Sequence, residues 1–288
     1  MEFLRPATLA EALALKAERP GAVPIAGGTD VMVELNFDHR RPEALLDLTR
    51  VGELTEWSTV EDGTVRLGAG VPYSRVITEL GESVPALAMA SRTVGSPQIR
   101  NRGTVGGNLG AASPAGDTHP VLLALDARIE VASVRGTRLL AAEEFYVGVK
   151  RHALEPDELI TAVHLPAHAG PQQFAKVGTR NAMVIAVCSF ALALRNGRVG
   201  AAIGSAAPTP RRARAAEEFL AAELPWGSSE ALPDSLKRRF GDLVAEATSP
   251  IDDVRGSAAY RKHALGVLAR RTLTWAWDEH RTGERACA

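Results

Sequence analysis

The sequence predicts an α+β protein made of three successive parts, and three observations indicate this class. Helix and strand patterns alternate over the first 50 residues, as they do in a small α/β subdomain. From about Gln172 the pattern is that of a meander of antiparallel strands, with a hairpin turn at Asn196–Gly197. The pattern becomes helical after Thr209. We expect the limits of the three parts at residues 1–52, 53–170 and 171–288.

The first part opens with a helix signal. Thr8 and Glu11 have the spacing of a capping box, which predicts a helix over 9–18 that ends before a Pro-Gly pair. The apolar run "AVPIAGG" (22–28) predicts a buried strand, and "ALLDLT" (44–49) predicts another short one. These elements together make up the expected α/β subdomain.

The second part begins with a strand over 63–71. Ser74 can cap a helix that ends near Leu80, and a further helix is expected over 84–94 with Pro85 in its first turn. The alternation of these elements continues the mixed character of the chain.

A Gly/Asn/Ser-rich stretch, 95–119, follows these helices. It is too long for a simple connection, so we interpret it as a functional loop. Two later segments, 121–133 and 137–145, flank a turn at Arg135–Gly136, and an alternating segment over 157–166 ends at a proline.

The third part supplies the antiparallel strands and the last helices. The segment 172–178 and the apolar stretch 185–207 account for the strands. Three helices are expected over 213–222, 236–248 and 257–280, and Ser257 is the N-cap of the last one.

Composition excludes several classes of protein. The chain has 288 residues, 45% of them hydrophobic, which is enough for two or three packed subdomains. Its formal net charge of -1 gives no support to a nucleic-acid or anionic-membrane partner. No apolar run is long enough to span a membrane, and the N-terminus lacks the pattern of a signal peptide. We therefore expect a cytoplasmic protein.

Cysteines and histidines give no basis for a metal site in this chain. Of the two cysteines, Cys188 lies in an apolar run and Cys287 lies near the C-terminus. Two thiols are too few for an iron–sulfur cluster or a disulfide framework. The histidines form no H-E-x-x-H zinc motif, and no nucleophile-elbow motif supports a hydrolase.

Two glycine segments carry the strongest functional signal. In "VPIAGGTDVM" (23–32) an apolar strand stops at paired glycines, a hydroxyl and an acid, and "GTVGGN" (103–108) has paired glycines beside similar polar groups. Glycine tolerates positive φ and has no Cβ, so successive amides can point at an anion. Each segment alone could be a simple turn, but two from separate subdomains could clamp a pyrophosphate. "GAGVPYSR" (68–75) is no dinucleotide fingerprint, because Tyr73 replaces its third glycine.

The same segments belong to a longer pattern. "AGGTD" (26–30) is followed about 75 residues later by "QIRNRGTVGGNLGAASPAGD" (98–117), and then by "PDELITAVHLP", "FAKVGTR", "GSAAPTPRRA" and "DDVRGSAAYRKHAL". In these residues and their order, the chain resembles the FAD-binding (medium) subunit of the molybdenum hydroxylases. That family includes xanthine dehydrogenase, carbon monoxide dehydrogenase and hydroxybenzoyl-CoA reductase. The resemblance runs nearly from end to end.

The resemblance implies an FAD-binding domain of the vanillyl-alcohol-oxidase (p-cresol methylhydroxylase-like) type. FAD would lie between the two N-terminal subdomains, and a C-terminal domain of antiparallel strands and helices would follow. The two glycine loops would bind the pyrophosphate, and Asp117 would bind ribose or ribityl hydroxyls. Leu159 or Ile160 would touch the isoalloxazine ring, and Lys176 would lie near its polar edge. The implied cofactor-binding residues are Ile25, Ala26, Gly27, Gly28, Thr29, Asp30, Val94, Gly95, Thr104, Gly106, Gly107, Asn108, Asp117, Leu159, Ile160 and Lys176.

Some of these residues have simpler interpretations that the sequence leaves open. Asp117 could cap a helix at "THPVLLAL", and Lys176 could be a solvated strand lysine. Arg100 and Arg102 could offset cofactor charge, but exposed arginines near a loop are ordinary, so we leave them out of the site. The family often has an arginine where this chain has Thr179, which bears on any acceptor contact there.

The function implied by the resemblance is electron transfer. Electrons would come from a molybdenum-cofactor large subunit through the 2Fe–2S clusters of a small subunit, pass to FAD in this chain, and leave to NAD+, a quinone, ferredoxin or oxygen. The complex would be a dimer of heterotrimers. No catalytic residue or metal ligand is assigned to this chain, and the substrate would bind in another subunit.

Two other classes stay open. A self-contained flavin oxidase or reductase of the same superfamily would need an acid or base over the flavin, and the sequence identifies none. A scaffold that has lost its flavin would not need intact glycines in both loops. The basic segment "YRKHALGVLARR" (260–271) is either a solvated helix face or a surface that docks a partner subunit.

Overall fold

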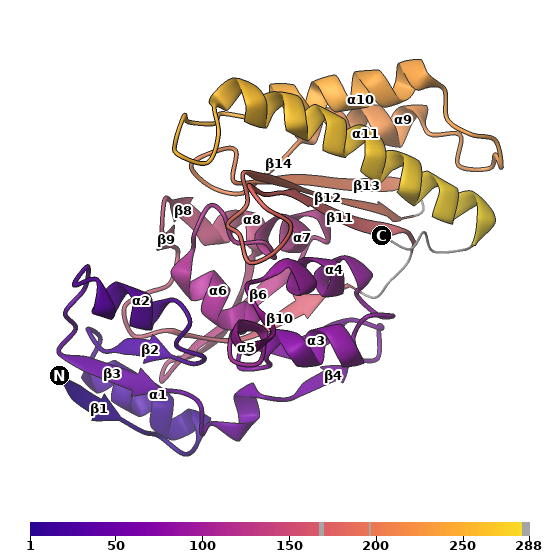
Figure 1. Ribbon diagram of the computed structural model, residues 1–288. Helices are drawn as coiled ribbons and strands as arrows, with labels where there is room; N and C mark the ends of the chain where they lie inside the picture. Colours follow the sequence, from indigo (N-terminus) through magenta and orange to yellow (C-terminus); the bar gives the residue numbers. More distant parts are fainter. Residues whose placement is uncertain (167–169, 196, 284–288) are drawn as a thin grey trace.

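The structure is a computed structural model, and it describes residues 1–166, 170–195 and 197–283. Three main sheets follow one another along the chain, with helices packed between and outside them (Figure 1). The mixture of helices and strands agrees with the predicted α+β class. Asn196 of the expected hairpin turn, and also Cys287, lie outside the described residues.

The first sheet is small and parallel, as the α/β pattern predicted. Its strands have the order β1 (Glu2–Leu4), β3 (Ala44–Asp47) and β2 (Val23–Ile25). Helix α1 (Leu9–Glu18) begins where the capping box predicts, because Thr8 Oγ1 accepts a hydrogen bond from the Glu11 amide at 3.2 Å. The short helix α2 (Val31–Asn36) follows β2 after the first glycine segment.

The second sheet is antiparallel and has its last strand at its centre. The order is β4 (Trp57–Thr59), β5 (Val65–Gly68), β10 (Leu159–Leu165), β6 (Arg128–Ser133) and β7 (Gly136–Ala141). The chain therefore returns after about ninety residues to place β10 beside β5. A bulge interrupts β10 between Ile160 and Ala162, which bends the strand locally.

The helix after β5 corrects one prediction. Helix α3 (Tyr73–Glu79) has Pro72 as its N-cap, so the predicted Ser74 cap is wrong. The start of α3 is fixed one residue before Ser74, because the Tyr73 amide donates a hydrogen bond to the Gly103 carbonyl at 3.0 Å. Helix α4 (Pro85–Thr93) begins at the predicted proline.

The stretch 95–119 holds short helices, whereas the sequence predicted a loop there. It contains α5 (Pro97–Arg100), α6 (Val105–Ala111) and the start of α7 (His119–Ala124). Ser96 and Thr104 cap α5 and α6 with their hydroxyl oxygens. Helices this short show no periodic pattern, so only their caps could have indicated them. A turn of helix, α8 (Ala142–Phe145), and the hairpin β8 (Tyr146–Gly148) and β9 (Arg151–His152) complete this region.

The third sheet is the predicted antiparallel meander. Its strands run in chain order: β11 (Gln172–Val177), β12 (Cys188–Arg195), β13 (Arg198–Gly204) and β14 (Arg211–Arg212). Helices α9 (Arg214–Glu223), α10 (Asp234–Glu246) and α11 (Ala258–Thr282) cover one face, while α4 and α7 lie on the other (Figure 1). Ser257 caps α11 as predicted, through a bond from the Tyr260 amide.

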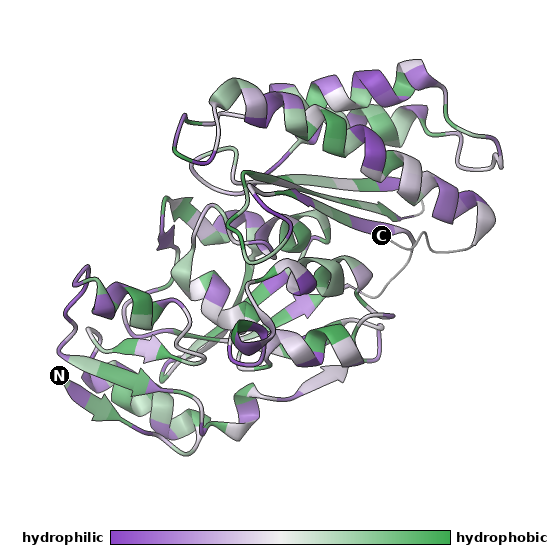
Figure 2. Ribbon diagram, in the orientation of Figure 1, coloured by the Kyte–Doolittle hydropathy of each residue, from purple (hydrophilic) through white to green (hydrophobic). Residues whose placement is uncertain are grey.

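The third sheet is buried on both faces, and this joins the C-terminal part to the rest. Along β12, Phe190 and Leu192 belong to the core under α9–α11, whereas Ala191 and Ala193 belong to the core of the second sheet. Figure 2 accordingly shows β12 largely green, while α9–α11 carry both colours. Burying one large apolar side chain completely contributes about 1.5–3 kcal/mol. The two cores therefore hold the sheet against both layers.

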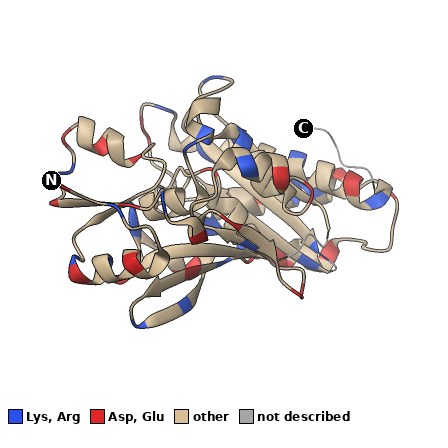
Figure 3. Ribbon diagram, turned by 90° about the horizontal axis from the view of Figure 1, so that it is seen from below, with Lys and Arg blue, Asp and Glu red and all other residues tan. Residues whose placement is uncertain are grey.

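Two surface properties bear on the expected setting. Acidic and basic residues are interspersed in the view of Figure 3, in keeping with the net charge of -1. None of the helices in the described ranges combines the length and the apolar character that crossing a bilayer takes. The limits of the three parts and the cytoplasmic location stay predictions.

Candidate cofactor site

The structure brings the two glycine segments into direct contact. Gly27 lies so close to the second segment that a Cβ there would overlap the Arg102 carbonyl group and would lie 2.9 Å from the Gly103 nitrogen. Glycine at 27 is therefore required by the contact between the two segments, whether or not a ligand binds. This contact places the end of β2 beside the start of α6.

The first segment presents several backbone amide groups that make no hydrogen bond to the described part of the chain. It runs from Ile25, at the end of β2, to Asp30, the N-cap of α2, whose side chain makes no capping bond. Gly28 has φ +72°, a conformation that favours glycine. Within the described residues the amides of Gly27, Gly28 and Thr29 donate no hydrogen bond. Successive free amides of this kind are suited to an anion.

In the second segment, the surroundings of Gly106 exclude a side chain, whereas those of Gly107 are largely open. A Cβ on Gly106 would lie 2.5 Å from both the Cβ and the carbonyl oxygen of Ala69, so packing against the end of β5 excludes a side chain. Gly107 is exposed, and a Cβ there would meet only the Thr104 hydroxyl oxygen, at 3.2 Å. Its amide donates to that oxygen at 2.9 Å. Gly107 is thus open on the side away from the protein.

Asp117 follows the second glycine segment along the chain and pairs with a residue of the C-terminal part. Its Oδ2 accepts hydrogen bonds from Lys176 Nζ at 2.6 Å and from Thr93 Oγ1 at 3.0 Å. Its Oδ1 is buried and has no hydrogen-bond partner among the residues that the structure describes. Burial raises the pKa of Asp117 above its ordinary value, and the attraction of Lys176 opposes that rise. A buried acceptor left free in this way is suited to a hydroxyl donor of a ligand.

These contacts decide two alternatives that the sequence left open. Asp117 does not cap α7, because Thr118 is the N-cap and no side chain makes a capping bond there. Lys176 is not a solvated strand lysine, since its side chain is 8% exposed and its Nζ also donates to the Thr93 carbonyl at 3.2 Å. Both interpretations are wrong, and β11 instead places Lys176 against Asp117.

The end of α4 is held by an arginine that the sequence left outside the site. Val94 is the C-cap of α4, and Gly95 follows it with φ +46°. Arg100 Nη1 donates to the carbonyls of both residues at 3.0 Å, and to that of Arg92 at 3.2 Å. Arg100 therefore caps the carbonyl end of α4.

The two apolar candidates on β10 belong to different cores. Leu159 is 1% exposed and packs in the core of the first part, with Leu46 and Leu54. Ile160 is 9% exposed, packs in the core of the second sheet and stands at the bulge. Only Ile160 keeps some accessible surface.

Several polar residues of this region were missed by sequence reasoning. Thr118 Oγ1 donates to Asn108 Oδ1 at 2.8 Å, and His119 Nε2 lies 3.2 Å from the Asn108 carbonyl oxygen. Burial lowers the pKa of His119 to about 4, so its ring is neutral at pH 7. It lies against Tyr146, with ring centroids 4.9 Å apart. Thr118 and His119 therefore hold Asn108 in place, and no local motif marks these residues in the sequence.

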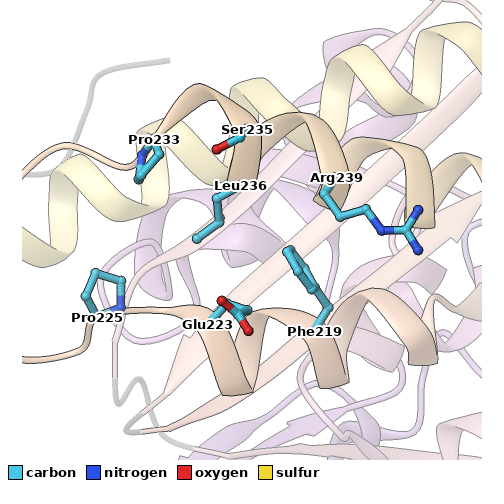
Figure 4. Close-up of a pocket in the computed structure, with 7 residues that line it drawn as sticks. All are labelled: Phe219, Glu223, Pro225, Pro233, Ser235, Leu236 and Arg239. Atoms are coloured by element: carbon cyan, nitrogen blue, oxygen red, sulfur yellow. The ribbon is translucent and has the colours of Figure 1, made fainter.

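Other features of the described residues do not compete with this site. A depression of about 440 Å³ lies between α9 and α10, where Phe219 and Leu236 point into it (Figure 4). It belongs to the outer helical layer, far from α6 in Figure 1. No group of three or more His, Cys, Asp and Glu side chains that could hold a metal ion is found in the part of the chain that the structure describes.

Two glycine segments in contact, together with a buried carboxylate that has a free oxygen, are features suited to the class of proteins that bind a nucleotide-bearing cofactor. Comparison with known proteins gives the particular family. Residues 1–168 match the model described as FAD binding domain in molybdopterin dehydrogenase, and residues 173–276 match the model described as CO dehydrogenase flavoprotein C-terminal domain. The chain belongs to this family of FAD-binding subunits of molybdenum hydroxylases, which are oxidoreductases.

Relatives match over almost the whole chain. A putative xanthine dehydrogenase FAD-binding subunit of Escherichia coli K12 is 33% identical over 284 residues, which cover 94% of each chain. Nicotine 6-hydroxylase medium subunit of Paenarthrobacter nicotinovorans is 32% identical, over 95% of this chain and 96% of that one. Among solved structures, carbon monoxide dehydrogenase from Hydrogenophaga pseudoflava matches with a TM-score of 0.87 at 27% identity, covering 96% of this chain and 97% of that chain.

Proposed function

We propose that this chain is the FAD-carrying electron-transfer subunit of a molybdenum-containing hydroxylase or dehydrogenase complex. It passes electrons from the iron–sulfur clusters of a small subunit to an external acceptor. Two observations carry the proposal together: the free, buried Oδ1 of Asp117, and the amides of Gly27, Gly28 and Thr29, which donate no hydrogen bond within the described residues. The carboxylate oxygen can accept a hydrogen bond from a hydroxyl of FAD, and the amides can donate to its pyrophosphate.

The chain's own residues bind and orient the cofactor. Backbone amides of the first segment and the side of Gly107 receive the pyrophosphate, with Thr29, Thr104 and Asn108 around it. Asp117 accepts a hydrogen bond from a ribose or ribityl hydroxyl, and Lys176 keeps a positive charge beside it. Of the two residues on β10 we assign the ring contact to Ile160, because Leu159 is buried in another core. FAD, when bound, supplies the electron-transfer chemistry.

The clusters and the molybdenum centre belong to partner subunits in this proposal. Relatives are named as subunits or medium chains, among them the carbon monoxide dehydrogenase medium chain of Afipia carboxidovorans, 31% identical over 285 residues. One solved relative is described as a Cu,Mo-CO dehydrogenase. We further propose a dimer of heterotrimers and a vanillyl-alcohol-oxidase-type FAD domain.

Isolation of the chain with its natural partners tests this function. We expect a tagged chain, purified from its own cells, to be yellow, to release FAD on acid precipitation, and to bring two further chains that contain molybdenum and iron. Mass spectrometry of the co-purified chains and metal analysis give the result. A colourless preparation would support a scaffold without flavin, and a yellow chain that comes alone would favour a self-contained flavoenzyme.

Asp117→Asn is expected to weaken FAD binding by about 1–3 kcal/mol, the cost of leaving buried polar groups poorly paired. An amide accepts through one oxygen only and removes the charge that Lys176 pairs with at 2.6 Å. Titration of the apoprotein with FAD measures the change. Asp126→Asn is the matched control, because Asp126 also pairs with arginines of the C-terminal part but is 45% exposed. An unchanged dissociation constant in Asp117→Asn would remove this residue from the site.

A further inference from the structure

Arg261 on α11 is a buried charge that joins three segments of the C-terminal part. It is 3% exposed. Its Nη1 donates to the carbonyls of Val187 and Ser205, both at 2.7 Å, and its Nη2 pairs with Asp253 Oδ1 at 2.5 Å. Burying a guanidinium is costly unless it is paired and hydrogen-bonded. Carrying this charge into the core therefore fixes all three acceptors in place.

One of these contacts leads to Lys176. The Val187 amide donates to the Val177 carbonyl at 2.8 Å. This bond joins the two ends of the segment 178–186, which begins two residues after Lys176. Ser205 Oγ also holds the C-terminal end of this segment, because it donates to the Ala186 carbonyl at 2.7 Å. Arg261 thus holds the end of β11 through Val187.

A second contact leads to Asp117 from the other side. Ser205 has φ +58°, a conformation that is strained for a residue other than glycine and persists only when its surroundings enforce it. Its carbonyl accepts from Arg261, and its amide donates to the Pro114 carbonyl at 2.9 Å. Pro114 precedes Asp117 by only three residues. The two routes from Arg261 therefore converge on the Asp117–Lys176 pair.

We propose that Arg261 is a positioning residue for the cofactor site. With Asp253 it fixes Val187 and Ser205, and through them it holds Lys176 and Asp117 so that Asp117 Oδ1 stays free for the cofactor. Arg261 makes no contact with the pair itself and acts only through these backbone routes. The inference rests on the proposed function, because it concerns the same FAD site.

Arg261→Gln and Arg261→Lys in the full chain test this role, with Arg255→Gln as the matched control. Arg255 pairs with the same Asp253, at 2.9 Å, but is exposed and makes no bond to Val187 or Ser205. We expect Arg261→Gln to raise the FAD dissociation constant at least tenfold. It should also shift the visible absorption bands and the midpoint potential of bound FAD, because the charge of Lys176 moves. Arg261→Lys should recover part of both effects, and Arg255→Gln should match wild type.

The possible outcomes separate this inference from the proposed function. A folded Arg261→Gln that binds FAD with wild-type affinity, bands and potential overturns the positioning role. If only its melting temperature falls, Arg261 is structural and the inference is again wrong. If Arg261→Gln does not fold, Arg261→Lys and Asp253→Asn carry the test, and normal flavin properties in both overturn it. A wild-type chain that binds no FAD contradicts the proposed function itself.

Discussion

Gly107→Val is expected to abolish FAD retention while the protein stays folded. Gly107 is exposed, and a Cβ there meets only the Thr104 hydroxyl oxygen, at 3.2 Å. That oxygen must shift by a few tenths of an ångström, so the protein can accept a side chain at a small local cost. The proposed pyrophosphate position cannot, since the valine would occupy the space of a phosphate oxygen. We expect the FAD dissociation constant to rise at least ~100-fold, about 2.8 kcal/mol, as measured by titration of the apoprotein.

Two neighbouring glycines on α6 make this experiment specific. Gly110→Val is the matched control, because Gly110 lies on the same helix and a Cβ there would have no atom within 4 Å, so FAD binding should be unchanged. Gly106→Ala should instead destabilise the protein and lower its melting temperature, because the new Cβ would lie 2.5 Å from Ala69. Full flavin occupancy in Gly107→Val at wild-type affinity would remove the second segment from the clamp.

Gly28→Val should also lose FAD, but for two combined reasons. The backbone at Gly28 has φ +72°, so any side chain adds strain there even without a ligand, and its Cβ would lie 3.3 Å from Met32 Cγ. A loss of both stability and FAD is therefore expected in this variant. Gly107 is the cleaner position at which to test the clamp.

The second large effect concerns turnover: the isolated chain, loaded with FAD, is expected to show no substrate-dependent flavin reduction. The chain has two cysteines, and Cys188 is buried in the core under α9–α11 with its pKa raised by burial to about 12. A thiol in that setting is no cluster ligand. Under the proposed function, electrons from an organic substrate therefore reach the flavin from another chain.

Stopped-flow absorbance of the flavin measures this prediction. A chemical reductant should bleach the isolated flavoprotein and an oxidant should restore it, which shows that the cofactor is competent. Aldehydes, purines or carbon monoxide should leave it oxidised until iron–sulfur and molybdenum subunits are added. Reduction of the isolated, metal-free chain by any of these substrates would contradict the subunit function and favour a self-contained flavoenzyme.

The sequence by itself determined the features that depend on neighbours along the chain. The capping box of Thr8 and Glu11 and the Ser257 cap use contacts within a few residues, and the apolar strands of the meander follow one another along the chain, so these features can be recognised locally. The order of the glycine motifs along the chain indicated the family, which the matches over 1–168 and 173–276 confirmed. The roles of the individual site residues stay predictions.

Only the tertiary structure decided which residues meet and which atoms are left for a ligand. Asp117 and Lys176 lie 59 positions apart and pair because the third sheet packs against α4 and α7. The contact of Gly27 with Arg102 likewise depends on two subdomains meeting. A sequence states what each group can donate or accept, but the partner of a buried group follows from long-range packing. For this reason the helix-cap role of Asp117 and the solvated position of Lys176 were open in the sequence and excluded by the fold.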